Sequence, residues 1–110
     1  MTPTAHKLAE QNDRFRKTLI GGRVLITPGI RELELHQQCR IMEAVTNYTD
    51  FSEANDPYSE HEFGVVEIGD VPTVFWKIDY YNADLTAGSP DPLDPNVTVR
   101  VLTIYLASEH

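Results

Sequence analysis

The sequence predicts an α+β domain in which two helices pack on a mainly antiparallel sheet of about four strands, in the order α-β-α-β-β-β. Two segments carry apolar side chains at helical spacing, and four short segments are rich in β-branched and aromatic residues. Glycine or proline stands between most of these segments. A chain of 110 residues suits one domain, 1–110, with a core large enough to fold without cross-links.

The first helix is expected to begin at Thr2, which can cap it, with Pro3 in the first helical position. Gly21 and Gly22 end it, because glycine readily takes the left-handed conformation found at helix ends. The apolar face of this helix has members at steps of three, four or seven: Ala5, Leu8, Phe15 and Leu19. This periodicity places one stripe of the helix against the core.

A β-branched strand is expected over 23–27, and Pro28-Gly29 after it is a turn signal. The second helix is expected over about 34–48, with an apolar face at steps of three and four that includes Leu35, Cys39, Ile41, Met42 and Val45. The single cysteine cannot form an internal disulfide, which favours a reducing, cytoplasmic location. We expect Cys39 to be a small buried side chain rather than a reactive thiol.

Three further strands are expected in the second half of the chain. Those over 62–68 and 71–81 flank Gly69-Asp70, a pair of residues typical of tight hairpins. The connection that follows contains three prolines within 90–95 and is expected to be a stiff exposed loop. The last strand, over 97–106, has apolar residues on both faces, which predicts a place in the middle of the sheet.

The hairpin register decides which side chains face one another. With a two-residue loop Phe63 faces Trp76 in the core, and Glu60 lies opposite Asp79; a four-residue loop sets Glu62 opposite Asp79 instead. Only a three-residue loop separates these carboxylates, and it also places Phe63 and Trp76 on opposite faces. The repulsion between opposed carboxylates must be reduced by water, by a neighbouring lysine, by protonation through a raised pKa or by a bound cation.

A bound cation would make this cluster a metal or acid–base site, with His61, Glu62 and Asp79 as the metal-ligating candidates and Glu60 beside them. Strand alternation points His61 away from the acids, so the other interpretation is a solvated acidic rim with His61 at the edge of the core. No catalytic residue and no cofactor is assigned, because the chain lacks a glycine-rich phosphate loop, a paired-cysteine zinc signature and a nucleophile elbow.

The net charge of −8 is concentrated in the second half of the chain. Residues 1–49 carry a balance of +2, whereas residues 50–99 carry eleven acids against Lys77 alone. Such a segment repels nucleic acid and suits a basic protein partner, a cation or simple solubility. The chain has neither an apolar run of membrane-spanning length nor an export signal, so we expect no membrane association.

Tyrosines among carboxylates suit a protein-binding surface. Alternation places Tyr80 in the core beside Trp76 and Ile78, whereas the roles of Tyr58 and Tyr81 stay open. The candidate partner-binding residues are Asp56, Tyr58, Glu60, Glu62, Asp79, Tyr81 and Asp84.

Five blocks of the sequence resemble one bacterial family: NDRFRKTLIGG from Asn12, VLITPG from Val24, NDPYSEHEFG from Asn55, FWKIDYY from Phe75 and VLTI from Val101. Together they are similar to the domain of unknown function 3768, which is common in alphaproteobacterial chromosomes, plasmids and prophages. The chain differs from the family pattern at Pro28, Glu62 and Asn82, where arginine, aspartate and aspartate are common. The resemblance implies a setting among accessory genes of mobile elements, where small acidic proteins often bind a host protein stoichiometrically.

The leading hypothesis is therefore a non-enzymatic, acidic interaction module that docks on the basic surface of a protein partner. It could act as a DNA-mimic-like inhibitor of a host nucleic-acid-binding or defence complex, of the anti-CRISPR or anti-restriction type. The alternative is a small metal-dependent hydrolase or nuclease-like enzyme that uses Glu60, His61, Glu62 and Asp79. A third hypothesis is a structural subunit or homodimer that pairs through a sheet edge or a helix face.

Overall fold

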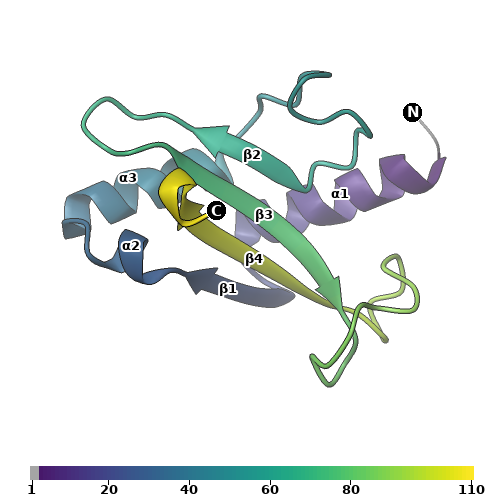
Figure 1. The fold of residues 1–110 in the computed structure, drawn as a ribbon. Coiled ribbons are helices and arrows are strands. Elements are labelled where there is room, and N and C mark those ends of the chain that lie inside the picture. Colours follow the sequence, from purple (N-terminus) through teal and green to yellow (C-terminus); the bar gives the residue numbers. More distant parts are fainter. Residues whose placement is uncertain (1–2) are drawn as a thin grey trace.

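The computed structural model describes residues 3–110 and contains a four-stranded mixed sheet with its longer helices on one face (Figure 1). The helices are α1 (Pro3–Thr18), α2 (Pro28–Arg31) and α3 (Leu35–Thr46), followed at the C-terminus by the 3-10 helix η1 (Ala107–Glu109). The strands are β1 (Gly22–Ile26), β2 (Phe63–Val66), β3 (Val74–Tyr81) and β4 (Val99–Leu106). The predicted α+β class is confirmed, and the predicted cap Thr2 lies outside the described residues.

The strands lie in the order β1-β4-β3-β2. β4 pairs in parallel with β1 and antiparallel with β3, and β3 pairs antiparallel with β2. The central position predicted for the last strand is confirmed. The parallel pair is possible because the chain between β1 and β4 is long enough to return to the same end of the sheet.

Alternate residues of β3 and β4 point toward α1 and α3 and form the core. Burial of these apolar side chains is the main stabilising contribution of the sheet. The cluster includes Phe15 from α1, Ile41 and Val45 from α3, and Val74, Trp76, Ile78, Leu102 and Ile104 from the sheet.

The core face of α3 differs from the predicted one. Ile41 and Val45 are fully buried, and the buried line continues to Tyr48 just beyond the helix. Leu35 is 75% exposed, and Cys39 is exposed as well. The prediction of a buried Cys39 is therefore wrong. The reason is that the helix face carrying Ile41 and Val45 packs against the sheet. Cys39 lies on an adjacent face, which points to solvent.

The turn expected at Pro28-Gly29 is the first turn of α2, with Pro28 at its start. Proline suits this position because its missing N–H has no intrahelical acceptor there. Gly29 packs tightly, since an added Cβ would lie 2.8 Å from the side chain of Leu106.

The hairpin register is the main correction to the sequence-based prediction. Phe63 pairs with Lys77, Gly64 with Trp76, Val65 with Phe75, and Val66 with Val74. A three-residue loop would give the same register. Here the strands are joined by the longer loop 67–73, which also has an odd number of residues. The predicted pairing of Phe63 with Trp76 and the predicted opposition of a carboxylate to Asp79 are both wrong.

Size complementarity explains this register. Gly64 lies opposite Trp76, and a Cβ on Gly64 would lie 2.6 Å from Cε2 of the Trp76 ring, still closer to its Nε1, and 2.7 Å from Cζ of Tyr48. The glycine therefore leaves the space that the indole fills. Within the connecting loop, the N–H of Val71 donates to the carbonyl of Ile68, and Val71 is itself buried.

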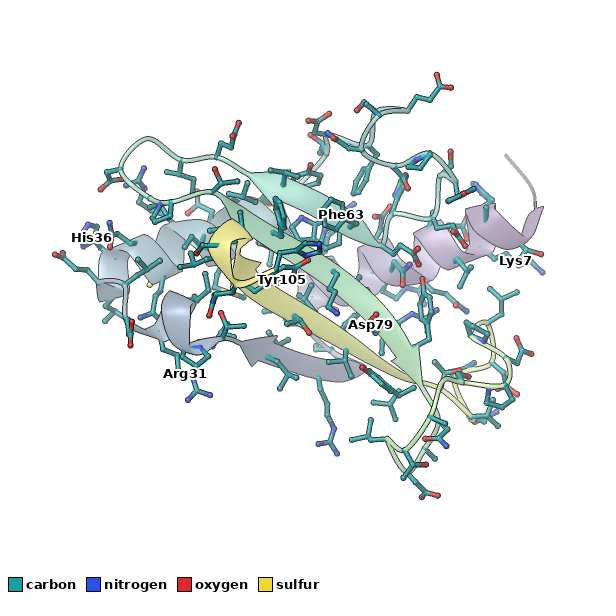
Figure 2. All side chains as sticks on the ribbon, in the orientation of Figure 1. Lys7, Arg31, His36, Phe63, Asp79 and Tyr105 are labelled. Carbon is teal, nitrogen blue, oxygen red and sulfur yellow. The ribbon has the colours of Figure 1, made fainter. Side chains whose placement is uncertain are left out.

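The second face of the sheet is not covered by α1 or α3. Figure 2 shows Phe63, Asp79 and Tyr105 on this face, turned away from the two helices. A groove of about 350 Å³ crosses it, and its lining includes Arg23, Lys77 and Asp79. Tyr81 also lines this groove, whereas Tyr80 packs against the core on the helical face.

Candidate functional site

The polar side chains of α1 meet the loop over residues 49–62 on the helical face of the sheet. Asn12 and Arg16 are each 0% exposed and stand one helical turn apart among the apolar residues of α1. A buried polar side chain is tolerated only when its hydrogen bonds are satisfied. Both residues meet this requirement through contacts outside α1.

Arg16 ties α1 to the end of α3. Its Nε donates to the carbonyl of Val45 at 3.0 Å, and its Nη2 donates to the carbonyl of Tyr48 at 3.2 Å. Its Nη1 donates to the Asp13 carboxylate at 2.9 Å, which supplies the countercharge. The guanidinium also lies 5.1 Å from the ring centre of Trp76, within the range of a cation–π interaction.

His61 lies between two carboxylates. Its Nδ1 is 3.0 Å from both oxygens of Asp13, and its Nε2 is 3.6 Å from Oδ2 of Asp56. Because a carboxylate only accepts, the ring nitrogen that contacts Asp13 carries the proton of that hydrogen bond. The imidazole also stacks on Phe51 with ring centres 3.8 Å apart. The hydrogen bond from Nδ1 binds the loop to α1, whereas the Nε2 to Asp56 distance is longer than a hydrogen bond.

Asp56 shapes the backbone that carries His61. Its Oδ1 accepts hydrogen bonds from the N–H groups of Glu60 at 3.1 Å and His61 at 3.3 Å. Ser59 and His61 both have positive φ, at 56° and 55°. A non-glycine residue rarely adopts this region without support. Asp56, which is 7% exposed, supplies that support through its two backbone contacts.

Asn12 connects the loop to the sheet. Its amide donates to the carbonyl of Glu60 at 2.9 Å and to the Tyr80 hydroxyl at 2.7 Å. The Tyr80 hydroxyl donates in turn to Glu62 at 2.9 Å. Burial, together with the adjacent Glu62 carboxylate, raises the pKa of Tyr80, so this hydroxyl stays protonated as a donor. The oxygen of Asn12 accepts from Nε of Arg100 at 3.0 Å.

The predicted metal ligands do not converge. Glu62 bonds to Tyr80 on the helical face, whereas Asp79 lies on the uncovered face, 3.2 Å from Nζ of Lys77. The register explains the separation. The residue opposite Glu62 is Ile78 and not Asp79, since the N–H of Ile78 donates to the carbonyl of Glu62. His61 contacts Asp13 and Asp56 instead. Across residues 3–110 no three His, Cys, Asp or Glu side chains are placed to hold one metal ion.

The remaining partner-binding candidates lie in different environments. Tyr58 is 75% exposed on loop 49–62, and Asp84 is exposed on the loop over 82–98. Glu60 is partly buried, and burial with the nearby Glu62 and Asp56 carboxylates raises the pKa of Glu60. Asp56 is enclosed by the fold and acts on the loop backbone.

The network also includes residues that sequence reasoning missed, namely Asn12, Asp13, Arg16 and Arg100. A signal for two of them was present. Asn12 fills the step between Leu8 and Phe15 on the core-facing stripe of α1, and Arg100 occupies the inward-pointing phase of β4 with Leu102 and Ile104. A polar residue at a core-facing position marks a buried polar contact.

The family model described as Protein of unknown function (DUF3768) matches residues 26–109. The chain belongs to this family. The DUF3768 match includes Asp56, His61 and Tyr80, whereas Asn12 and Asp13 precede it. The polar network therefore joins the matched region to a helix outside it. No curated protein and no solved structure matches the chain. Within the described part of the chain, no helix is both long enough and apolar enough to cross a bilayer.

Proposed function

We propose that the protein is a non-enzymatic interaction module that docks its acidic end on the basic surface of a protein partner. The acidic end consists of loops 49–62 and 82–98, which together contain eight carboxylate side chains and no lysine or arginine. Figure 1 shows loop 49–62 above α1 and loop 82–98 below it, where β3 ends and β4 begins. This gathering of carboxylates from two segments distant in the sequence is the observation that supports the proposal.

Adjacent residues of α1 hold the two loops at this end. The amide of Gln11 donates to the carbonyl of Leu93 at 3.0 Å, and the amide of Asn12 donates to the carbonyl of Glu60 at 2.9 Å. The acidic side chains are therefore carried on loops fixed to one helix. A fixed surface loses less conformational entropy on binding than a flexible one, which favours affinity.

Half of the eight carboxylates at this end belong to exposed residues. Asp56 is enclosed, but Glu53, Asp84 and Asp91 are exposed, and none of the three forms an ion pair within residues 3–110. A field of one sign accelerates association with an oppositely charged partner and weakens as salt screens it. Such a surface suits a protein site that normally holds nucleic-acid phosphate. We therefore propose a stoichiometric inhibitor of a nucleic-acid-binding or defence complex of a mobile-element host.

The metal-dependent hydrolase is the weaker proposal, because Glu62 and Asp79 lie on opposite faces of the sheet and His61 already contacts two carboxylates. An interaction module needs no converging ligands. The geometry supports it better for this reason.

The test compares two double variants with the same change in net charge. Glu53→Gln with Asp84→Asn neutralises the acidic end, and Glu32→Gln with Glu67→Gln neutralises exposed acids elsewhere. Proteins captured from a bacterial lysate by the wild-type protein are purified, and their affinity is measured at increasing salt. We expect affinity to fall steeply with salt, and to fall about ten-fold for the first variant only, given one or two lost charge contacts. A partner whose affinity ignores both salt and the first variant contradicts the proposal.

We propose homodimerisation through β1 as a second interaction. β1 is an edge strand; its Leu25, which lines the groove on the uncovered face, is 53% exposed, and Ile20 just before the strand is 76% exposed. An unpaired edge with apolar side chains can pair with another strand. Sedimentation at increasing protein concentration should show a dimer that Leu25→Lys abolishes. A monomer at every concentration contradicts this proposal.

A further inference from the structure

Arg100 is a buried cation that has only neutral hydrogen-bond partners. It is the second residue of β4 and is 6% exposed. Its Nε donates to Asn12, and its Nη2 donates to the side-chain oxygen of Gln11 at 2.5 Å and to the carbonyl of Pro92 at 3.0 Å. Within residues 3–110, no Asp or Glu forms an ion pair with it.

The other buried arginine shows the contrast. Arg16 is also enclosed, but Asp13 supplies a carboxylate at 2.9 Å. A buried charge is costly unless an opposite charge accompanies it. Burial lowers the pKa of Arg100, and the Tyr80 ring, 5.3 Å from the guanidinium carbon, offers only partial compensation. In a chain with seventeen acids, the lack of a carboxylate at Arg100 is a specific feature of the fold.

A pocket opens beside this guanidinium. It has a volume of about 200 Å³ and lies between the end of α1, the start of β1 and loop 82–98. Its charged lining consists of Arg100 and Arg14, without any acidic residue. Arg14 is exposed and has no ion-pair partner among residues 3–110. Nη1 of Arg100 likewise has no protein acceptor in the described chain.

We propose that this pocket binds a phosphate dianion, either as inorganic phosphate or as the end group of a phosphomonoester. Two guanidinium groups supply two positive charges, which a phosphate dianion balances and a single carboxylate does not. Arginine N–H groups match the oxygens of phosphate in pairs. The apolar lining residues Phe15 and Ile20 leave an uncharged wall for the carbon part of an ester.

This site borders the acidic end, since Pro95 of loop 82–98 lines the pocket, but its charged lining residues are of the opposite sign. It also has a structural consequence. Arg100 and Gln11 both contact loop 82–98, through the carbonyls of Pro92 and Leu93. A dianion that compensates Arg100 would therefore also stabilise the attachment of this loop to α1.

Calorimetric titration tests the site with three probes at constant ionic strength: inorganic phosphate, phenyl phosphate and acetate. Arg14→Gln is the first variant, since Arg14 is exposed and its replacement leaves the core intact, and Arg31→Gln is the matched control on α2. We expect phosphate to bind the wild-type protein, Arg14→Gln to weaken it about ten-fold or more, and Arg31→Gln to leave it unchanged. Arg100→Lys, which keeps the charge but loses the planar fork, should weaken it as well.

Tighter binding of phenyl phosphate than of inorganic phosphate would assign the pocket to phosphomonoesters, and the reverse order would assign it to the free ion. Both results support the site, provided that nuclear magnetic resonance signals of the Gln11 side-chain amide and of Gly21 shift during the titration. Three results overturn the proposal: no binding of either phosphate probe, equal weakening by Arg31→Gln, or acetate binding as tightly as phosphate.

Discussion

Nδ1 of His61 lies 3.0 Å from both carboxylate oxygens of Asp13, a residue 48 positions earlier in the chain. The same carboxylate accepts a hydrogen bond from the fully buried Arg16, which in turn bonds to backbone carbonyls at the end of α3. Asp13 and Arg16, which contact each other, thus join α1 to loop 49–62 and to the end of α3, respectively. The position of the acidic end depends on this arrangement.

Replacing Asp13 with asparagine should destabilise the protein. The substitution removes the countercharge of a buried guanidinium and weakens the contact with His61, which together should lower the free energy of unfolding by about 2–4 kcal/mol. Urea denaturation measures the change. Glu10→Gln, at an exposed site on the same helix, should change it by less than about 0.5 kcal/mol. Equal effects of the two substitutions would show that the Asp13 contacts contribute little.

The glycines of the hairpin offer a second comparison. Gly64→Ala places a methyl group against Trp76 and Tyr48 and should cost about 1–3 kcal/mol of stability. Gly69→Ala meets no atom within 4 Å and should be nearly neutral. Thermal unfolding of both variants checks the pairing of Gly64 with Trp76, because in the register first predicted Gly64 does not face Trp76. A neutral Gly64→Ala would argue against the observed register.

The general fold could be predicted from the sequence because apolar side chains mark the positions that are buried in the folded protein. The central position of β4 follows from apolar residues on both of its faces, and this was confirmed. The hairpin register could not be predicted in the same way. It depends on the fit between Gly64 and the Trp76 ring and on a loop, 67–73, whose length the Gly69-Asp70 pair does not reveal.

The site was only partly predictable for a related reason. His61 and Glu62 were selected from their position among acids, but their actual partners, Asp13 and Tyr80, depend on tertiary packing. Single polar residues at core-facing positions, such as Asn12, were the usable signal. That signal identifies a buried contact without naming the partner.

The exposure of Cys39 gives a simple test of how α3 is oriented. A thiol on the solvent side of the helix should react with a maleimide in the native protein at nearly the rate seen after unfolding. Mass spectrometry after a short reaction measures this. A Cys39 that reacts only in denaturant would instead place it on the buried face.

Glu60 provides a prediction about pH. Burial and repulsion from Glu62 and Asp56 raise the pKa of Glu60 above its ordinary value, so the folded state holds this proton more tightly than the unfolded state does. Ionised Glu60 therefore opposes folding at neutral pH, and the effect disappears below the unfolded pKa of about 4.3, where the carboxyl is neutral in both states. Glu60→Gln should stabilise the protein at pH 7 by less than about 1 kcal/mol, since the site is partly open to solvent. The gain should vanish near pH 3.5, about one unit below that value. Glu67→Gln, at an exposed position in the hairpin loop, is the control. The urea midpoints of the wild-type protein and of Glu60→Gln are compared at the two pH values. A gain in stability that persists in acid would come from packing and not from charge.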